Sequence, residues 1–109
     1  MKQGEIVILN FPFTDLSQTK TRPALIISND SFNKHRNIML IAISTQKGSS
    51  NYYLSLKQNN LEKGSLNKSS FIRLQNIFVA EKRLIKNIVA KISDTFLNKV
   101  QSNLISFIK

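Results

Sequence analysis

Two short apolar runs near the N-terminus, separated by a polar loop, constrain the fold more than any other feature of the sequence. Both runs consist largely of Val, Ile and Leu, so we expect strands over about Glu5–Asn10 and Pro23–Ser28. The loop between them ends in Arg22, directly before Pro23. Because proline disfavours the helical conformation in the residue before it, Arg22 is predicted to be extended at the start of the second strand.

Further apolar runs predict more strands along the chain. A continuous run over Ile38–Ile43 predicts a buried central strand, and alternation over Tyr52–Lys57 predicts a half-buried one. Ser69–Val79 is also strand-like, whereas Ile85–Ile92 fits either a strand or a short helix. The intervening residues 33–37 are expected to be exposed, and 58–67 to form a polar connection with a turn at Lys63-Gly64.

The C-terminus has the pattern of an amphipathic helix. Ser93 suits the N-cap and Asp94 suits the first turn. The apolar side chains that recur at helical spacing, and that we expect to pack in the core, are Phe96, Leu97, Val100, Leu104, Phe107 and Ile108. The fold class is therefore mainly β with a C-terminal helix, in which neighbouring strands pair antiparallel into a small curled barrel.

Net charge gives the first indication of partners. The chain of 109 residues is expected to form one domain over residues 1–109, and 16 Lys and Arg against 6 Asp and Glu give a net charge of +10. Such an excess predicts attraction to polyanions such as nucleic acid. A lysine-rich soluble surface and an acidic protein partner are the alternative interpretations.

Several classes of protein are disfavoured by composition. The chain has no Cys, so disulfides and thiolate metal sites are excluded. A single histidine, His35, and few acids argue against a metal site, and 3 glycines without a nucleotide-binding motif indicate no cofactor. No signal peptide or membrane-spanning run is evident, which predicts a cytoplasmic protein.

A phosphodiester substrate would need cationic and hydroxyl groups, and the chain offers a few. Arg22 could fork onto phosphate oxygens, although an exposed loop arginine would look the same. Ser44 and Thr45 end a buried strand, where hydroxyls either bind phosphate or only cap the strand. Arg73 places a charge in a largely apolar strand, and Gln75, two residues on, lies on the same face of that strand. Such a pair suits either a phosphate site or an ordinary solvent-facing strand edge.

The residues considered so far fall in segments that together resemble a known family. The segments are GEIVILNFPFTD, KTRPALIISND, LIAISTQ and SSFIRLQNIFVAEKRLI, which occur in the same order as in the MazF/PemK family of toxin–antitoxin endoribonucleases. The resemblance covers nearly the whole chain. It implies an SH3-like curled antiparallel β-barrel with a C-terminal helix.

The resemblance also implies an activity and partners. Family members are homodimers that cleave single-stranded RNA, chiefly mRNA, without metal, leaving 2′,3′-cyclic phosphate and 5′-hydroxyl ends. A cognate MazE/PemI-like antitoxin, with which they bind DNA, neutralises them by laying an acidic, initially disordered tail into the RNA site.

Site residues follow from the resemblance position by position. It implies catalytic roles for Arg22, Ser44, Thr45 and Arg73. For an RNA substrate, we also expect RNA contacts from Thr14, Asp15, Lys20, Gln46, Lys47 and Gln75. Gln75 stands where the Kid-like branch of the family has an aspartate implicated in catalysis. Because a glutamine cannot take up a proton at neutral pH, either the base lies elsewhere or Arg22 and Ser44 carry more of the reaction.

Two other functions remain open from the sequence. One is a non-enzymatic gyrase poison like CcdB on the same barrel, although the tryptophan-containing terminal helix of that protein has no counterpart here, because the chain has no Trp. The other is an RNA-binding barrel without activity, which the glutamine at position 75 keeps open.

Overall fold

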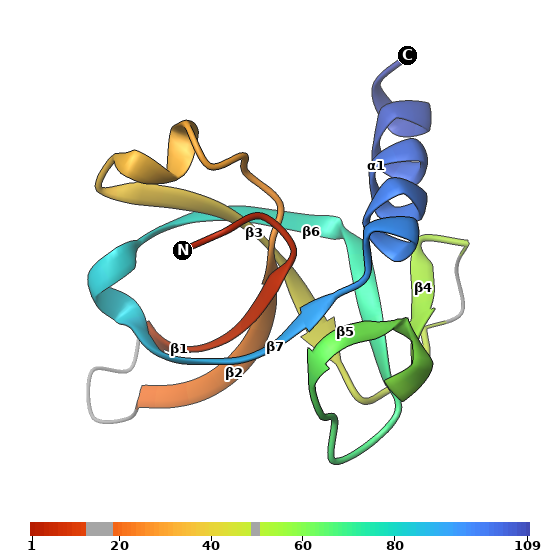
Figure 1. Ribbon diagram of the computed structural model, residues 1–109, viewed down its shortest axis with the longest axis horizontal. Helices are drawn as coiled ribbons and strands as arrows, with labels where there is room; N and C mark the ends of the chain where they lie inside the picture. The colour runs from red at the N-terminus through yellow and green to blue at the C-terminus, as the bar shows by residue number, and fades with distance from the viewer. Residues whose placement is uncertain (13–18, 49–50) are drawn as a thin grey trace.

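The computed structural model describes residues 1–12, 19–48 and 51–109, and these form a curled sheet flanked by one α-helix (Figure 1). The strands and the helix are β1 (Glu5–Pro12), β2 (Thr19–Ile26), β3 (Asn37–Ser44), β4 (Tyr53–Leu56), β5 (Leu61–Gly64), β6 (Ser70–Glu81), β7 (Ile85–Ile92) and α1 (Asp94–Ile108). Three short 3₁₀ turns join them: η1 (Phe32–Lys34), η2 (Gln58–Asn60) and η3 (Lys82–Leu84).

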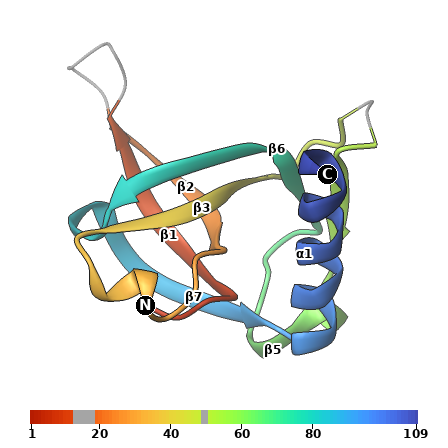
Figure 2. The same cartoon turned by 90° about the horizontal axis from the view of Figure 1, so that it is seen from above.

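All pairings within the sheet are antiparallel. The strand order is β4-β6-β3-β2-β1-β7-β5, so β3 and β2 lie in the middle, and the sheet curls strongly across its width (Figure 2). Consecutive strands β1, β2 and β3 are neighbours, as expected for short links. The predicted class, mainly β with a curled antiparallel sheet and a C-terminal helix, is confirmed.

For one segment the structure decides between two predicted alternatives, and for another it corrects the prediction. Residues 85–92 form strand β7, which pairs with both β1 and β5 and therefore needs the extended conformation. Residues 58–67 are not only a polar connection, because they contain η2 and strand β5. Charged side chains on β5 conceal its strand character in the sequence, since it is an edge strand with most of its side chains exposed.

The core has two parts, one on each face of the sheet. Strand β3 contributes to both: Ile38 and Leu40 belong to one cluster, and Ile41 and Ile43 belong to the other. This two-sided burial explains why the strand is a continuous apolar run instead of an alternating one. The prediction of a buried central strand is correct, although Met39 is exposed.

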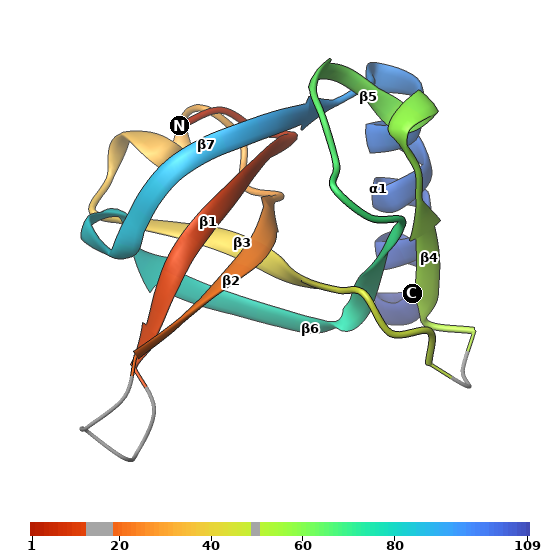
Figure 3. The same cartoon turned by 90° about the horizontal axis from the view of Figure 1, so that it is seen from below.

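Helix α1 covers one of these faces next to β4 and β6 (Figure 3). The Ser93 hydroxyl accepts a hydrogen bond from the backbone N–H of Phe96 at 3.2 Å, as expected of the N-cap. Phe96 and Val100 are buried in the core, whereas Phe107 and Ile108 are exposed. Only part of the predicted apolar stripe therefore packs in the core. Among the described residues, no helix is long and apolar enough to cross a membrane.

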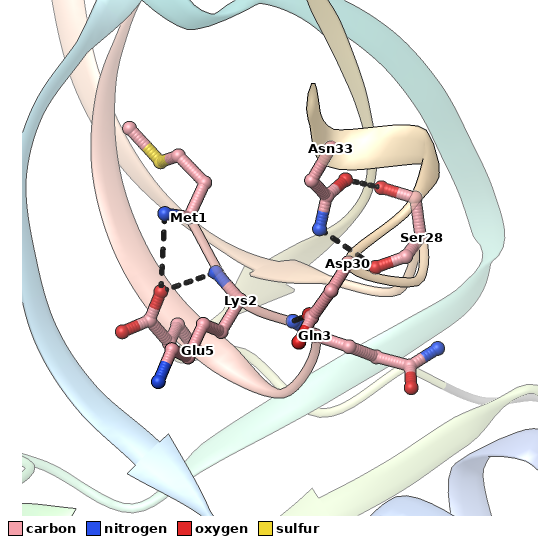
Figure 4. Close-up of polar contacts among 7 residues, drawn as sticks. All are labelled: Met1, Lys2, Gln3, Glu5, Ser28, Asp30 and Asn33. Carbon is pink, nitrogen blue, oxygen red and sulfur yellow. Dashed lines mark hydrogen bonds and ion pairs between the residues drawn. The ribbon is translucent and has the colours of Figure 1, made fainter. Parts of the chain in front are cut away.

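A polar cluster ties the N-terminus to the turn after β2 (Figure 4). The backbone N–H of Gln3 donates to Asp30 Oδ1 at 3.1 Å, and the Asn33 side chain donates to the Ser28 carbonyl at 2.9 Å. Asn33 is buried, which corrects the expectation that residues 33–37 are all exposed. Its amide satisfies the Ser28 carbonyl inside the turn and also accepts a hydrogen bond from the Ser28 hydroxyl.

Strand β6 bends in the middle, and the bend creates the main irregularity of the sheet. Ile72 pairs with Ile43 and Ile77 pairs with Ile41, so residues 73–76 lie opposite the single residue Ala42. Before the bend, β6 also pairs with β4; after it, β6 pairs only with β3. Bulges of this kind re-aim side chains and are common next to functional sites.

Candidate functional site

The bend in β6 forms one wall of a cavity with a volume of about 770 Å³. Four strands and the segment after β3 supply its walls. The lining residues are Phe11, Arg22, Pro23, Ala42, Ile43, Ser44, Thr45, Gln46, Arg73, Gln75, Asn76, Ile77 and Phe78.

Arg22 and Ser44 reach the cavity because β2 and β3 separate at one end. Their pairing ends with Ala24 opposite Ala42. Since residues two apart share a face of a strand, the next residues on that face are Arg22 and Ser44, and both line the cavity. Pro23 has no N–H to offer β3, which is consistent with the end of the pairing there.

The opposite wall comes from the bulged residues of β6. Arg73, Gln75 and Asn76 all line the cavity, and they belong to the stretch that has no partners on β3 apart from Ala42. Regular pairing of β6 with β3 would have left the two strands too close for a cavity between them. The bulge therefore both opens the cavity and supplies its polar side chains.

The hydroxyl of Ser44 is fixed at the end of β3. Its Oγ accepts a hydrogen bond from the backbone N–H of Gln46 at 3.1 Å, which is a tight turn closed by a serine side chain. The hydroxyl proton remains available as a donor. Ser44 is half-buried, whereas Thr45 and Gln46 are exposed.

The electrostatic character of the cavity is positive. Arg22 and Arg73 are its only charged lining residues among those described, and neither forms an ion pair within the described part of the chain. The Nε atom of Arg73 is buried and has no hydrogen-bond partner. Two guanidinium groups, a hydroxyl and side-chain amides form a set of donors suited to a phosphodiester.

Comparison with protein families decides what kind of protein has this cavity. Residues 2–108 match the family described as PemK-like, MazF-like toxin of type II toxin-antitoxin system. The chain belongs to this toxin family. The match spans every strand and the whole of helix α1, so the resemblance found in the sequence is confirmed.

Solved structures of toxins share the fold at low sequence identity. A MazE-MazF complex from Deinococcus radiodurans aligns with a TM-score of 0.81 and 17% identity, covering 99% of this chain and 95% of that one. An endoribonuclease in complex with its cognate antitoxin from Mycobacterial species gives 0.76 and 15%, covering 97% and 92%. The Mycobacterium tuberculosis toxin MazF-mt6 gives 0.72 and 17%, covering 93% and 91%. No curated protein sequence matches this chain significantly.

Most of the predicted site residues of this toxin-family member come together in space. The six that line the one cavity are Arg22, Ser44, Thr45, Gln46, Arg73 and Gln75. Lys20 and Lys47 are exposed and do not line it. Thr14 and Asp15 lie outside the described residues. Their individual roles in binding or cleavage stay predictions.

Some lining residues of the toxin site were not predicted from the sequence. Phe11 and Phe78 form an aromatic wall, with ring centroids 5.2 Å apart and planes tilted by 50°. Asn76 follows Gln75 in a largely apolar strand, and this polar pair is the signal that could have indicated the bend. Nothing in the sequence distinguishes Phe11 and Phe78 from ordinary core residues.

The acidic and imidazole groups of the toxin lie elsewhere in the part of the chain that the structure describes. No cluster of three or more His, Asp or Glu that could hold a metal occurs among the described residues. His35 Nδ1 lies 3.0 Å from the Phe32 carbonyl in the turn after β2, and His35 does not line the cavity.

Proposed function

We propose that this member of the toxin family is a metal-independent endoribonuclease that cleaves single-stranded RNA, chiefly mRNA, in the cytoplasm. The observation that carries the proposal is the position of Arg22, Ser44 and Arg73, which come from three different strands and line one cavity on a chain of net charge +10. Residues far apart in sequence rarely supply two guanidinium groups, neither in an ion pair with a described residue, and a hydroxyl to one cavity without an anionic ligand.

In the proposed reaction, the ribose 2′-hydroxyl gives up its proton to water while its oxygen attacks the adjacent phosphorus, and the 5′-oxygen leaves and takes up a proton from water. The products are a 2′,3′-cyclic phosphate and a 5′-hydroxyl. Arg22 neutralises the scissile phosphate, and Arg73 stabilises the negative charge that grows on the phosphorane. Ser44, together with Thr45, donates a hydrogen bond that positions a phosphate oxygen.

The remaining polar and aromatic residues of the cavity suit contacts with the nucleosides. Gln46, Gln75 and Asn76 carry amide groups that can donate to and accept from base edges or the ribose. Phe11 and Phe78 offer aromatic surface, on which the bases of single-stranded RNA stack. Gln75 acts in binding and not as the base, since an amide does not take up a proton at neutral pH.

The proposed protein partners are an antitoxin and a second copy of the chain. Two structural neighbours are complexes of a toxin with its antitoxin. An acidic, initially disordered antitoxin tail fits a cavity with two arginines and, among its described lining residues, no acid. A homodimer is suggested by apolar exposure: Met39 pairs with Val79 across β3 and β6, and the two side chains are 36% and 56% exposed.

The direct test is to incubate the purified protein with mRNA in EDTA and to map the ends of the products. We expect cleavage that leaves cyclic phosphates, and we expect Arg22→Ala to abolish it while Arg36→Ala, an exposed arginine outside the cavity, cleaves normally. RNA that stays intact with the wild-type protein, or that Arg22→Ala cuts equally well, would contradict the proposal. Intact RNA together with gyrase-dependent DNA breaks would favour the CcdB-like alternative.

The dimer is tested separately by light scattering of the purified protein. Val79→Lys should shift the mass from two chains to one, whereas Lys86→Ala, an exposed residue on β7, should leave the mass unchanged. A wild-type protein that is monomeric at all concentrations would exclude this part of the proposal without affecting the cleavage assay.

A further inference from the structure

Tyr53 does not line the cavity, yet it contacts a residue that does. It is the first residue of β4 and lies directly opposite Arg73 in the pairing of β4 with β6. The guanidinium carbon Cζ of Arg73 lies 5.6 Å from the centroid of the Tyr53 ring. This distance is within the range in which an arginine is attracted to the face of an aromatic ring.

The contact with Tyr53 is notable because Arg73 has few other partners. Its Nε is buried without a hydrogen-bond partner, and no ion pair to it occurs among the described residues. A partly buried arginine is usually fixed by a carboxylate, which would also neutralise its charge. An aromatic ring fixes the guanidinium and leaves the charge and the N–H donors for an anion.

The Tyr53 ring is itself held from another side. A Cβ atom added to Gly48 would lie 1.9 Å from Cε1 of Tyr53 and 2.2 Å from its Cζ, so only a glycine fits against the ring at this position. Gly48 follows the segment that carries Ser44, Thr45 and Gln46 into the cavity. The ring therefore packs between that segment and Arg73, and it links two walls of the cavity.

We propose that Tyr53 is a positioning residue that fixes the Arg73 guanidinium at the cavity wall for a phosphodiester ligand. The role of Arg73 in cleavage rests on the proposed endoribonuclease function, whereas the contact that fixes the guanidinium does not. The aromatic face of Tyr53 makes the contact with the guanidinium, so the Tyr53 hydroxyl is dispensable. Gly48 is required because a side chain there would displace the ring.

The contact is tested first by NMR, without reference to activity. The N–H resonance of Arg73 Nε, assigned by its loss in Arg73→Lys, should be shifted by the ring current of Tyr53. We expect Tyr53→Phe to preserve this shift and Tyr53→Leu to abolish it. The matched control is Tyr52→Leu, because the Tyr52 ring contacts Phe107 of α1, at a centroid distance of 5.0 Å. A shift that survives in Tyr53→Leu would overturn the proposal.

Kinetics of RNA cleavage then separate positioning from binding and from stability. Loss of a contact of this strength should lower kcat about tenfold in Tyr53→Leu, with KM changed less than about twofold, while Tyr53→Phe stays within about twofold of wild type. Gly48→Ala should resemble Tyr53→Leu. Equal loss in Tyr53→Phe and Tyr53→Leu would assign the role to the hydroxyl, and a wild-type kcat in Tyr53→Leu would refute the positioning role.

The two proposals fail in different ways. If the wild-type protein cleaves no RNA, the endoribonuclease function is wrong, and the ring-current measurement still decides whether Tyr53 fixes Arg73. If the wild-type protein cleaves RNA and the Tyr53 variants behave as wild type in both measurements, only the positioning role is wrong.

Discussion

Arg73 shows how a charged residue is accommodated in an apolar strand. It is half-buried, it faces a cavity instead of the core, and its guanidinium group lies against an aromatic ring. Its neighbours Ile72 and Leu74 are fully buried. The sequence left a structural and a functional role equally open, and the open position at the cavity wall now favours the functional one.

We expect Arg73→Lys to reduce cleavage (kcat/KM) at least about 100-fold, which is the range found when one donor to a developing negative charge is removed. A lysine keeps the charge but loses the planar fork that can bind two phosphate oxygens at once. The rate is measured with a fluorescent oligoribonucleotide. The control is Arg83→Lys, which keeps a charge beside Glu81, its partner at 2.7 Å. Comparable activity of Arg73→Lys and wild type would mean that charge alone suffices.

His35→Gln should leave both the cleavage rate and its pH dependence unchanged. His35 is the only histidine of the chain, and it contacts the Phe32 carbonyl in a turn that does not line the cavity. The pH–rate profiles of the two proteins are compared under saturating RNA. A profile that changes shape in the variant would place the imidazole in the proton transfer and would contradict the site described here.

At the scale of elements, the helix that closes the chain depends on its N-cap. Ser93→Ala removes the hydroxyl that accepts from the N–H of Phe96, and it should lower the free energy of unfolding by about 1 kcal/mol. Thermal or denaturant unfolding measures the loss. Ser102→Ala, at an exposed position in the middle of α1, should be neutral or slightly stabilising. Equal stability of the Ser93 variant and wild type would show that the cap is not needed.

The sequence predicted correctly those elements whose residue pattern is determined locally, within the element. The strand over 38–43 and the helix after Ser93 were predicted because burial and capping leave local patterns. Strand β5 was missed because an edge strand with exposed charged residues has no apolar pattern. The bend in β6 depends on how it pairs with β3, and the pattern within one strand does not say which distant strand is its partner.

The same division applies to the candidate site. Arg22, Ser44 and Arg73 were expected from residue type and from family resemblance, and the structure places them in one cavity. Phe11 and Phe78 line that cavity but could not be predicted, because an aromatic residue at a cavity wall and one in a core have the same sequence pattern. The proposed role of Tyr53 is indirect, through its contact with Arg73. That contact depends on the register between β4 and β6, which the sequence does not show.

At the scale of the whole molecule, the net charge of +10 should dominate the affinity for RNA. Binding of an uncleavable 2′-deoxy oligonucleotide should weaken with salt, with a log–log slope of about −0.7 for each phosphate neutralised. Arg22→Gln should reduce the magnitude of that slope by about 0.7. Arg36→Gln removes the same charge away from the cavity and should change the slope much less; equal effects would indicate that only overall charge matters.

The two arginines of the cavity also affect the stability of the empty protein. Arg22 and Arg73 line the same space, and no acidic residue is among the described residues that line it, so these two positive charges repel each other across the cavity. Any anion that occupies the cavity relieves this repulsion, and a ligand at 100 times its dissociation constant stabilises a fold by about 2.7 kcal/mol. The melting temperature of this toxin-family member would then report occupancy of the cavity, and the proposed complex with an acidic antitoxin tail should melt at a higher temperature than the free protein.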